Sequence, residues 1–410
     1  TGTGPDYQIY SGTWLGGGSV KINRQIERDY QEQLWLTAPS LEDYVLEQYG
    51  WDLSTNLGGI RLKNPWGKAA GQLSLNTTQV DRDAQGGLGF VILKTVIAQD
   101  EQGSSVQSAW MVDAPRMLVE KITAQTGEQG WTVSWKGRGW SESFQSYLEF
   151  VETSFKLGVP KDCLIVPSCQ LPLYRGPENP HAEEYAYTLG ALGKVLQKAD
   201  QPALELDLSP TLLKDGPPPC AQETAEQLHW VISETRQHLP DNIKLGLKLF
   251  NLQSFAEQLA LMQAGAQVWN QLDWLTLANR LFSPERGISY GGYDLSNRNL
   301  AVLDSIRSEE EESGEQILPP SISATGNICS GRMLVEYAIR GCTTGQLHTY
   351  FQLPKGEYGY DLGSRTLSAL HELMFNPKEG LVASLEALRK QFGLEGELEF
   401  GKFFEKGGNK

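Results

Sequence analysis

The segment Ser321–Phe351 constrains the fold more than any other stretch of the chain. An apolar strand pattern at Ile322–Gly326 ends in a Thr-Gly-Asn turn, and apolar residues at helical spacing follow. Gly341 ends that helical pattern, and Gln346–Tyr350 reads as a second strand. The segment therefore predicts a strand–helix–strand unit, whose glycine turn at a helix start would expose backbone N–H groups to a phosphate.

The same alternation of strands and helices runs through the rest of the sequence. Strand patterns are expected at 59–71, 89–96, 163–168, 203–209, 244–250, 274–279, 322–326 and 346–350. Eight parallel strands separated by helices predict a (β/α)8 TIM barrel, of class α/β. The alternative is an open doubly wound sheet, but the GxGxxG expected after its first strand is missing.

Additions surround this predicted barrel. Residues 1–55 read as an N-terminal extension, 56–375 as the barrel and 376–410 as a closing helix and a loose tail. Residues 97–145 interrupt the alternation with two alternating segments around a turn that contains Gly127. They predict a β-hairpin inserted after the second strand.

Composition narrows the class of partner. The 410 residues carry a net charge of −15, which disfavours nucleic acid as a partner. No apolar run is long enough to span a membrane, and the acidic run Glu309–Glu312 is expected to be a solvated loop. Five scattered cysteines without CxxC spacing predict reduced thiols, with no metal or iron–sulfur site. Because the sequence begins with Thr1, a processed product in the cytoplasm or an organelle stroma is expected.

Five polar residues stand at the ends of four predicted strands. They are Lys94, Asp207, Ser209, Lys248 and Asn279. Lysines inside apolar strands are costly unless an anion lies beside them, so an ion pair of either lysine with Asp207 is one interpretation. The other is a bound anionic cofactor, which the glycine turns at the same end of the barrel favour.

Short segments in a characteristic order give the chain a resemblance to a known family. They include NPWGKAAG (64–71), GLGFVILKTV (87–96), ALELDLS (203–209), LGLKL (245–249), TLAN (276–279), ISATGNICSG (322–331) and GCTTGQLHTY (341–350). The chain resembles the dihydroorotate dehydrogenase family, and within it the flavin- and pyrimidine-binding domain of dihydropyrimidine dehydrogenase. The likeness extends over about three quarters of the chain.

The resemblance implies a site for FMN. Ala70 and Gly71 would line the edge of the isoalloxazine ring, Lys94 and Thr95 would lie at the strand end beside the ring, and Lys248 would be a second flavin lysine. Both lysines could stabilise negative charge on the reduced ring. Asn279 would lie near the substrate. The residues implied around the phosphate are Gly292, Gly326, Asn327, Thr349 and Tyr350.

The chain also departs from the family pattern in its fourth strand. Asp207 replaces an asparagine that contacts flavin or pyrimidine, and Pro210 occupies the position of the Cys or Ser acid/base. Proline cannot move a proton. Ser209, Thr211 or Cys220 could substitute, although Ser209 could equally be a hydrogen-bonding strand end. We interpret His348, beside the phosphate turn, as a packed, hydrogen-bonded histidine.

Two functions follow. The first is an FMN-dependent oxidoreductase acting on a C–C or C=C bond of a small cyclic substrate, which the lost acid/base predicts is not dihydroorotate. The second is a catalytically inactive barrel that serves as a binding or assembly subunit for a protein partner. An intermediate case binds flavin without pyrimidine chemistry, and the resemblance implies a possible homodimer. The fold alone does not decide among them.

Overall fold

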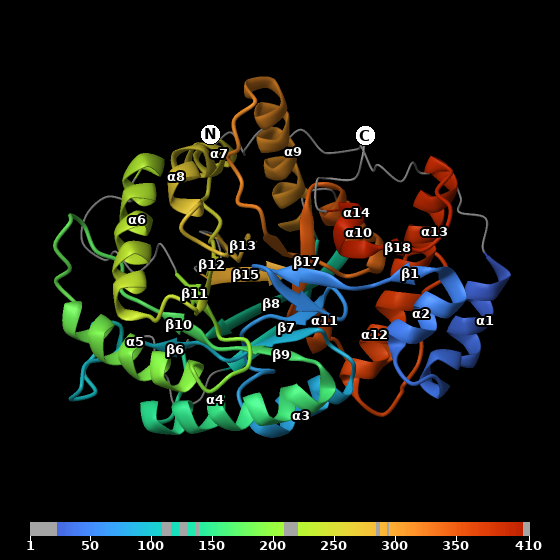
Figure 1. Ribbon diagram of the computed structural model, residues 1–410, viewed down its shortest axis with the longest axis horizontal. Helices are drawn as coiled ribbons and strands as arrows, with labels where there is room; N and C mark the ends of the chain where they lie inside the picture. Colours follow the sequence, from blue (N-terminus) through green and yellow to red (C-terminus); the bar gives the residue numbers. More distant parts are fainter. Residues whose placement is uncertain are drawn as a thin grey trace.

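The structure is a computed structural model that describes residues 23–108, 116–123, 129–136, 139–208, 220–283, 288–292 and 295–404. Parallel strands form a central barrel, and helices surround it (Figure 1). This arrangement confirms the predicted (β/α)8 barrel with its N-terminal extension and inserted hairpin.

Ten short strand segments make the eight strands of the barrel. They are β4 (Trp66–Lys68), β5 (Phe90–Ile92), β6 (Val96–Ile97), β9 (Leu164–Val166), β10 (Ser168–Gln170), β11 (Ala203–Asp207), β12 (Lys244–Lys248), β13 (Trp274–Leu277), β16 (Ile322–Thr325) and β17 (Cys342–Leu347). Segments β5 and β6 form one interrupted strand, and β9 and β10 form another, split at Pro167. Because β17 pairs with β4 and every ladder is parallel, the sheet closes on itself.

Helices connect the strands on the outside of the barrel. They are α3 (Thr77–Gln85), α4 (Phe144–Gly158), α5 (Ala182–Leu196), α6 (Ala221–His238), α7 (Phe255–Ala264), α8 (Ala266–Trp269), α9 (Leu295–Ser313), α10 (Gly331–Ile339) and α12 (Arg365–Phe375). Side chains that accept hydrogen bonds from the first turn define several starts, among them Asn76, Ser330 and Ser364. Such caps satisfy backbone donors that lack a partner within the helix.

Segments from both ends of the described chain cover one side of the barrel (Figure 1). The N-terminal part contributes α1 (Arg24–Glu32), a 3-10 turn (Leu34–Thr37), α2 (Leu41–Tyr49) and β1 (Trp51–Asp52), and the C-terminal part contributes α13 (Leu381–Phe392), β18 (Leu398–Glu399) and α14 (Phe400–Phe404). Strand β1 pairs in parallel with β18. No helix in the described ranges is long and apolar enough to cross a membrane.

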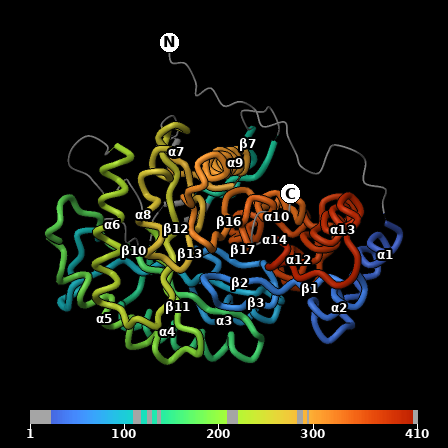
Figure 2. The backbone as a smooth tube through the Cα atoms, turned by 45° about the horizontal axis from the view of Figure 1, so that its top comes forward, coloured from blue at the N-terminus to red at the C-terminus, as the bar shows by residue number. Residues whose placement is uncertain are grey.

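A four-stranded antiparallel sheet carries the inserted hairpin. It contains β7 (Arg116–Thr123), β8 (Gln129–Lys136), β14 (Leu281–Ser283) and β15 (Ile288–Gly292), in the order β14-β15-β8-β7. The insertion after the second barrel strand is thereby joined to the loop that follows the sixth. In the view of Figure 2, β7 and α9 both lie at the top of the molecule.

The opposite end of the barrel is closed by a short hairpin. Strands β2 (Thr55–Leu57) and β3 (Ile60–Leu62) pack their apolar side chains against Phe90 and Trp274. Gly67 makes room for Phe90, since a Cβ atom there would lie 2.1 Å from the ring. The floor of the barrel is therefore apolar and filled, which leaves its carboxyl end as the place for a ligand.

Three details of the sequence interpretation are wrong. The eighth strand is Cys342–Leu347 rather than Gln346–Tyr350, because the chain turns into α11 (Thr349–Gln352). Glu309–Glu312 is not a loop but continues α9, where Arg307 forms a 2.7 Å salt bridge with Glu310. The tail is not loose at α14, since Phe400 and Phe404 are fully buried.

Candidate active site at the carboxyl end of the barrel

A cavity of about 270 Å³ opens at the carboxyl ends of the strands. Strands β12 and β17, the turns after β4, β13 and β16, and strands β8 and β15 of the antiparallel sheet contribute to its wall. Eight of the residues predicted from the sequence line it: Ala70, Lys248, Asn279, Gly292, Gly326, Asn327, Thr349 and Tyr350. Folding therefore gathers residues from six separate stretches of the sequence around one space.

The turn after β16 has the backbone conformation that the sequence suggested. Gly326 and Asn327 have φ values of 105° and 52°, in the left-handed region that glycine and asparagine tolerate. The Asn299 side chain donates hydrogen bonds to the backbone oxygens of Thr325 (2.8 Å) and Ala278 (3.2 Å). A Cβ atom on Gly326 would lie 2.6 Å from the Asn299 amide nitrogen. Asn299, which no sequence pattern indicated, thus holds this glycine corner in place.

Asp207 lies at the end of the fourth strand and accepts two side-chain hydrogen bonds. Thr95 Oγ1 donates one over 3.3 Å, and Asn279 Nδ2 donates the other over 3.2 Å. Thr95 is also 3.0 Å from the hydroxyl of Ser168. These bonds together link the ends of four barrel strands, and Asp207 orients the Asn279 amide at the cavity wall.

Lys248 is almost completely buried, and its charge acts on the carboxyl of Glu205. Glu205 is fully buried inside the barrel and accepts hydrogen bonds from Gln346 (2.6 Å) and Thr276 (2.8 Å). Burial raises the pKa of the Glu205 carboxyl, while the Lys248 charge and these hydrogen bonds oppose the rise. This carboxyl was missed in the sequence because it sits inside an apolar strand pattern.

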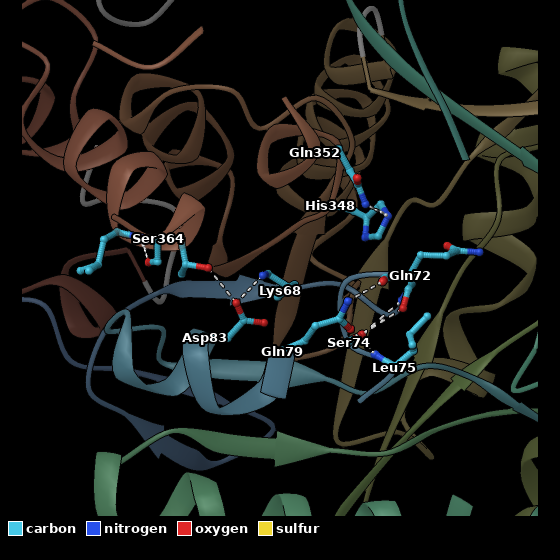
Figure 3. Close-up of polar contacts among 12 residues, drawn as sticks. Lys68, Gln72, Ser74, Leu75, Gln79, Asp83, His348, Gln352 and Ser364 are labelled. Atoms are coloured by element: carbon cyan, nitrogen blue, oxygen red, sulfur yellow. Dashed lines mark hydrogen bonds and ion pairs between the residues drawn. The ribbon is translucent and has the colours of Figure 1, made fainter. Parts of the chain in front are cut away.

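His348 is packed beside the cavity, as its sequence context suggested. A Cβ atom on Gly71 would lie 2.1 Å from His348 Cε1, so the turn after β4 and the end of β17 are in close contact. The His348 Nε2 atom lies 3.4 Å from the Gln352 amide (Figure 3). Burial lowers the His348 pKa to about 3, and the charges of Lys248 and Lys68 add to this effect. The ring is therefore neutral at physiological pH.

The antiparallel sheet contacts the edge of the cavity through Trp131. Trp131 Nε1 donates a hydrogen bond of 3.1 Å to Glu357, and Lys121 Nζ lies 4.8 Å from the Trp131 ring centroid. Trp131, Glu357 and Arg280 all line the cavity. No motif indicated these three residues, which converge only when the insertion folds over the barrel.

The remaining predicted residues are placed around the cavity rather than on its wall. Lys94 and Thr95 are buried at the second strand, next to Asp207 at the end of the fourth. Gly71 contacts the His348 ring. Ser209 lies outside the described residues. Within the described part of the chain, no group of three or more His, Cys, Asp or Glu residues could hold a metal ion.

Comparison with known proteins supports the fold. No protein-family model and no curated protein sequence matches the chain. Among solved structures, the chain is similar to a dihydroorotate dehydrogenase from Eimeria tenella in complex with ferulenol, with a TM-score of 0.54 and 16% sequence identity. The match covers 95% of this chain and 97% of that one. The chain therefore has a dihydroorotate dehydrogenase-like barrel fold.

Proposed function

We propose that this chain binds FMN in the barrel cavity and is an oxidoreductase of the CH–CH type. Its substrate is a small cyclic molecule other than dihydroorotate. The observation that carries the proposal is that the buried cation Lys248 and the glycine corner at Gly326 line one cavity. The similarity of the fold to a dihydroorotate dehydrogenase supports it.

The polar groups of the cavity wall fit a flavin. Gln346 lines the cavity. Its side-chain oxygen is buried and finds no hydrogen-bond partner in the described part of the chain, so it can accept from a ring N–H. The glycine corner precedes α10, whose first turn suits a phosphate. Bound FMN would supply hydride transfer.

The protein residues have separate roles in this proposal. Lys248 of the fifth strand would stabilise negative charge on the ring, together with Lys94 of the second strand. Asn279, fixed by its hydrogen bond to Asp207, would orient a polar substrate ring. Ser209 remains a candidate proton donor from its sequence position alone, because Pro210 has no group that transfers a proton.

The substitutions at Asp207 and Pro210 favour a second candidate function. A barrel that keeps its cavity but has lost its acid/base could act as a binding or assembly subunit. The two candidates differ in one measurable respect, which is whether added substrate changes the oxidation state of bound flavin.

The visible absorption spectrum of the purified protein tests cofactor binding. We expect flavin absorption, before or after incubation with FMN. Lys248→Met should lose at least about tenfold in FMN affinity, because a charge-assisted contact is removed, while the exposed Lys378→Met should bind normally. A colourless protein that does not take up FMN would contradict the proposal.

Rapid mixing then tests turnover. Flavin bleaching by dihydrouracil or another small cyclic substrate would support the oxidoreductase, and we expect none with dihydroorotate. A yellow protein that no such substrate bleaches would instead support the binding subunit.

A further inference from the structure

A second cavity lies outside the barrel, between α3, α12 and the segment that precedes α12. Its volume is about 510 Å³. Lys68 of β4 lines this second cavity and forms a buried salt bridge with Asp83 of α3. The ring of Phe351 covers the lysine on another side, with Nζ 4.6 Å from the ring centroid. Figure 3 shows Lys68 and Asp83 next to Ser364 at the start of α12.

The lining of this cavity has an excess of positive charge. Of the residues that the structure describes, four cations line it, Lys68, Arg82, Lys355 and Arg365, against the one carboxylate of Asp83. Lys355 is paired with Asp361 at 2.9 Å, whereas among the described residues Arg82 and Arg365 form no salt bridge. In a chain of net charge −15, this local excess is the reverse of the average surface. It favours an anionic ligand.

Helix α12 adds to this positive field. Ser364 caps the helix, and Ser364, Arg365 and Thr366 all line the cavity. The N-terminus of a helix carries a partial positive charge and favours anions. The helix end and the arginine side chains thus act on the same space.

Asp83 supplies a second, independent indication of a ligand. Its Oδ1 atom accepts hydrogen bonds from Lys68 and from Thr366 (2.7 Å). Its Oδ2 atom is buried and has no hydrogen-bond partner among the described residues, although the side chain lines the cavity and is only 2% exposed. A buried carboxylate oxygen without a donor is costly, and a ligand with a hydroxyl or ammonium group would satisfy it.

We propose that this cavity binds a small organic anion that carries a hydrogen-bond donor beside its acidic group. The carboxylate or phosphate of the ligand contacts Arg82, Arg365 and the start of α12. Its hydroxyl or ammonium group donates to Asp83. The site is separate from the flavin cavity and does not depend on the proposed function.

Ligand-observed NMR titration of the full chain tests this site. The probes are lactate, propionate, which lacks only the hydroxyl of lactate, and glycerol phosphate. The variant Arg82→Gln/Arg365→Gln removes two exposed cations at the cavity, and Lys378→Gln/Lys390→Gln removes two exposed cations on and beside α13. Both variants change the net charge equally, so the control isolates the position of the charge.

We expect lactate or glycerol phosphate to bind wild type and control with equal affinity, and the arginine variant at least about tenfold more weakly. Tighter binding of lactate than of propionate would support a hydrogen bond from the ligand hydroxyl to Asp83. Whichever of lactate and glycerol phosphate binds more tightly shows whether the site prefers a carboxylate or a phosphate. Absence of saturable binding, or an equal loss in both double variants, would overturn the proposal. FMN uptake should be unchanged by the arginine variant, so failure here is distinguishable from failure of the flavin site.

Discussion

The side-chain amide of Gln346 donates a hydrogen bond of 2.6 Å to Glu205 across the inside of the barrel, from the eighth strand to the fourth. Thr276 of the sixth strand donates to the same carboxyl oxygen over 2.8 Å. A polar layer therefore separates the cavity from the apolar floor. Because Lys248 lies close to this layer and lines the cavity, the ionisation of Glu205 influences the charge of the proposed flavin site.

Glu205 makes the stability of the protein depend on pH. Its folded-state pKa is raised above the ordinary value of 4.5, so the folded state binds more protons than the unfolded state above that pH. Its stabilising contribution is complete below 4.5 and is lost as the pH rises toward the folded pKa. We expect urea unfolding to show that wild type loses stability relative to Glu205→Gln over this interval. If Glu205→Gln and wild type differed by the same free energy of unfolding at every pH, the folded-state pKa of Glu205 would not be raised.

His348 predicts a dependence of stability on pH in the opposite direction. Its pKa falls from 6.5 to about 3 in the folded state, so below 6.5 the unfolded state binds the proton first. Stability is therefore lost as the pH falls from 6.5 toward 3, by up to about 1.4 kcal/mol per pH unit. His348→Gln should remove this slope, which urea titrations at several pH values would measure. An unchanged slope would mean that His348 does not carry it.

Gly326 should not tolerate a side chain. Its φ of 105° and the 2.6 Å approach of a Cβ atom to Asn299 predict that Gly326→Ala loses about 1–3 kcal/mol of unfolding free energy. Gly314 also has positive φ but open space around it. Gly314→Ala should therefore cost less, and equal losses would show that backbone strain alone accounts for the effect. FMN retention should fall only in the Gly326 variant.

The buried pair of Lys68 and Asp83 predicts strong coupling. Either Lys68→Met or Asp83→Leu alone leaves a buried charge without its partner, which costs about 3–5 kcal/mol. The double variant should cost clearly less than the sum of the two. Chemical denaturation of the four proteins completes the cycle, and additive losses would contradict the coupling.

The sequence predicted the barrel because alternation of strands and helices is a local pattern. Lys244–Phe250, for example, was expected as a strand and contains β12. The pattern failed at the eighth strand because Thr344 and Gln346 face a polar network inside the barrel, so the usual apolar signal is absent. The prediction of a loop at Glu309–Glu312 failed for a different reason. Arg307 and two backbone N–H groups stabilise Glu310 within α9.

The candidate site was predictable only where single residues carry a positional signal. Gly326 and Lys248 stand out in the sequence because a glycine turn and a buried lysine are unusual where they occur. Asn299, Arg280 and Trp131 have no such signal, because a helix, a loop and an inserted hairpin bring them to the site only after folding. Glu205 was missed because successive side chains of a strand point to opposite faces. A polar residue between two apolar ones is therefore normally interpreted as facing solvent, whereas Glu205 faces the inside of the barrel.

The pairing of Trp51 with Leu398 and of Asp52 with Glu399 has a consequence for biosynthesis. During translation the first of these strands leaves the ribosome long before its neighbour exists, so its edge lacks this partner until residues 398 and 399 have been made. This small sheet must therefore be among the last parts to assemble. A translating ribosome that stalls before residue 398 would leave that edge open for pairing with another molecule.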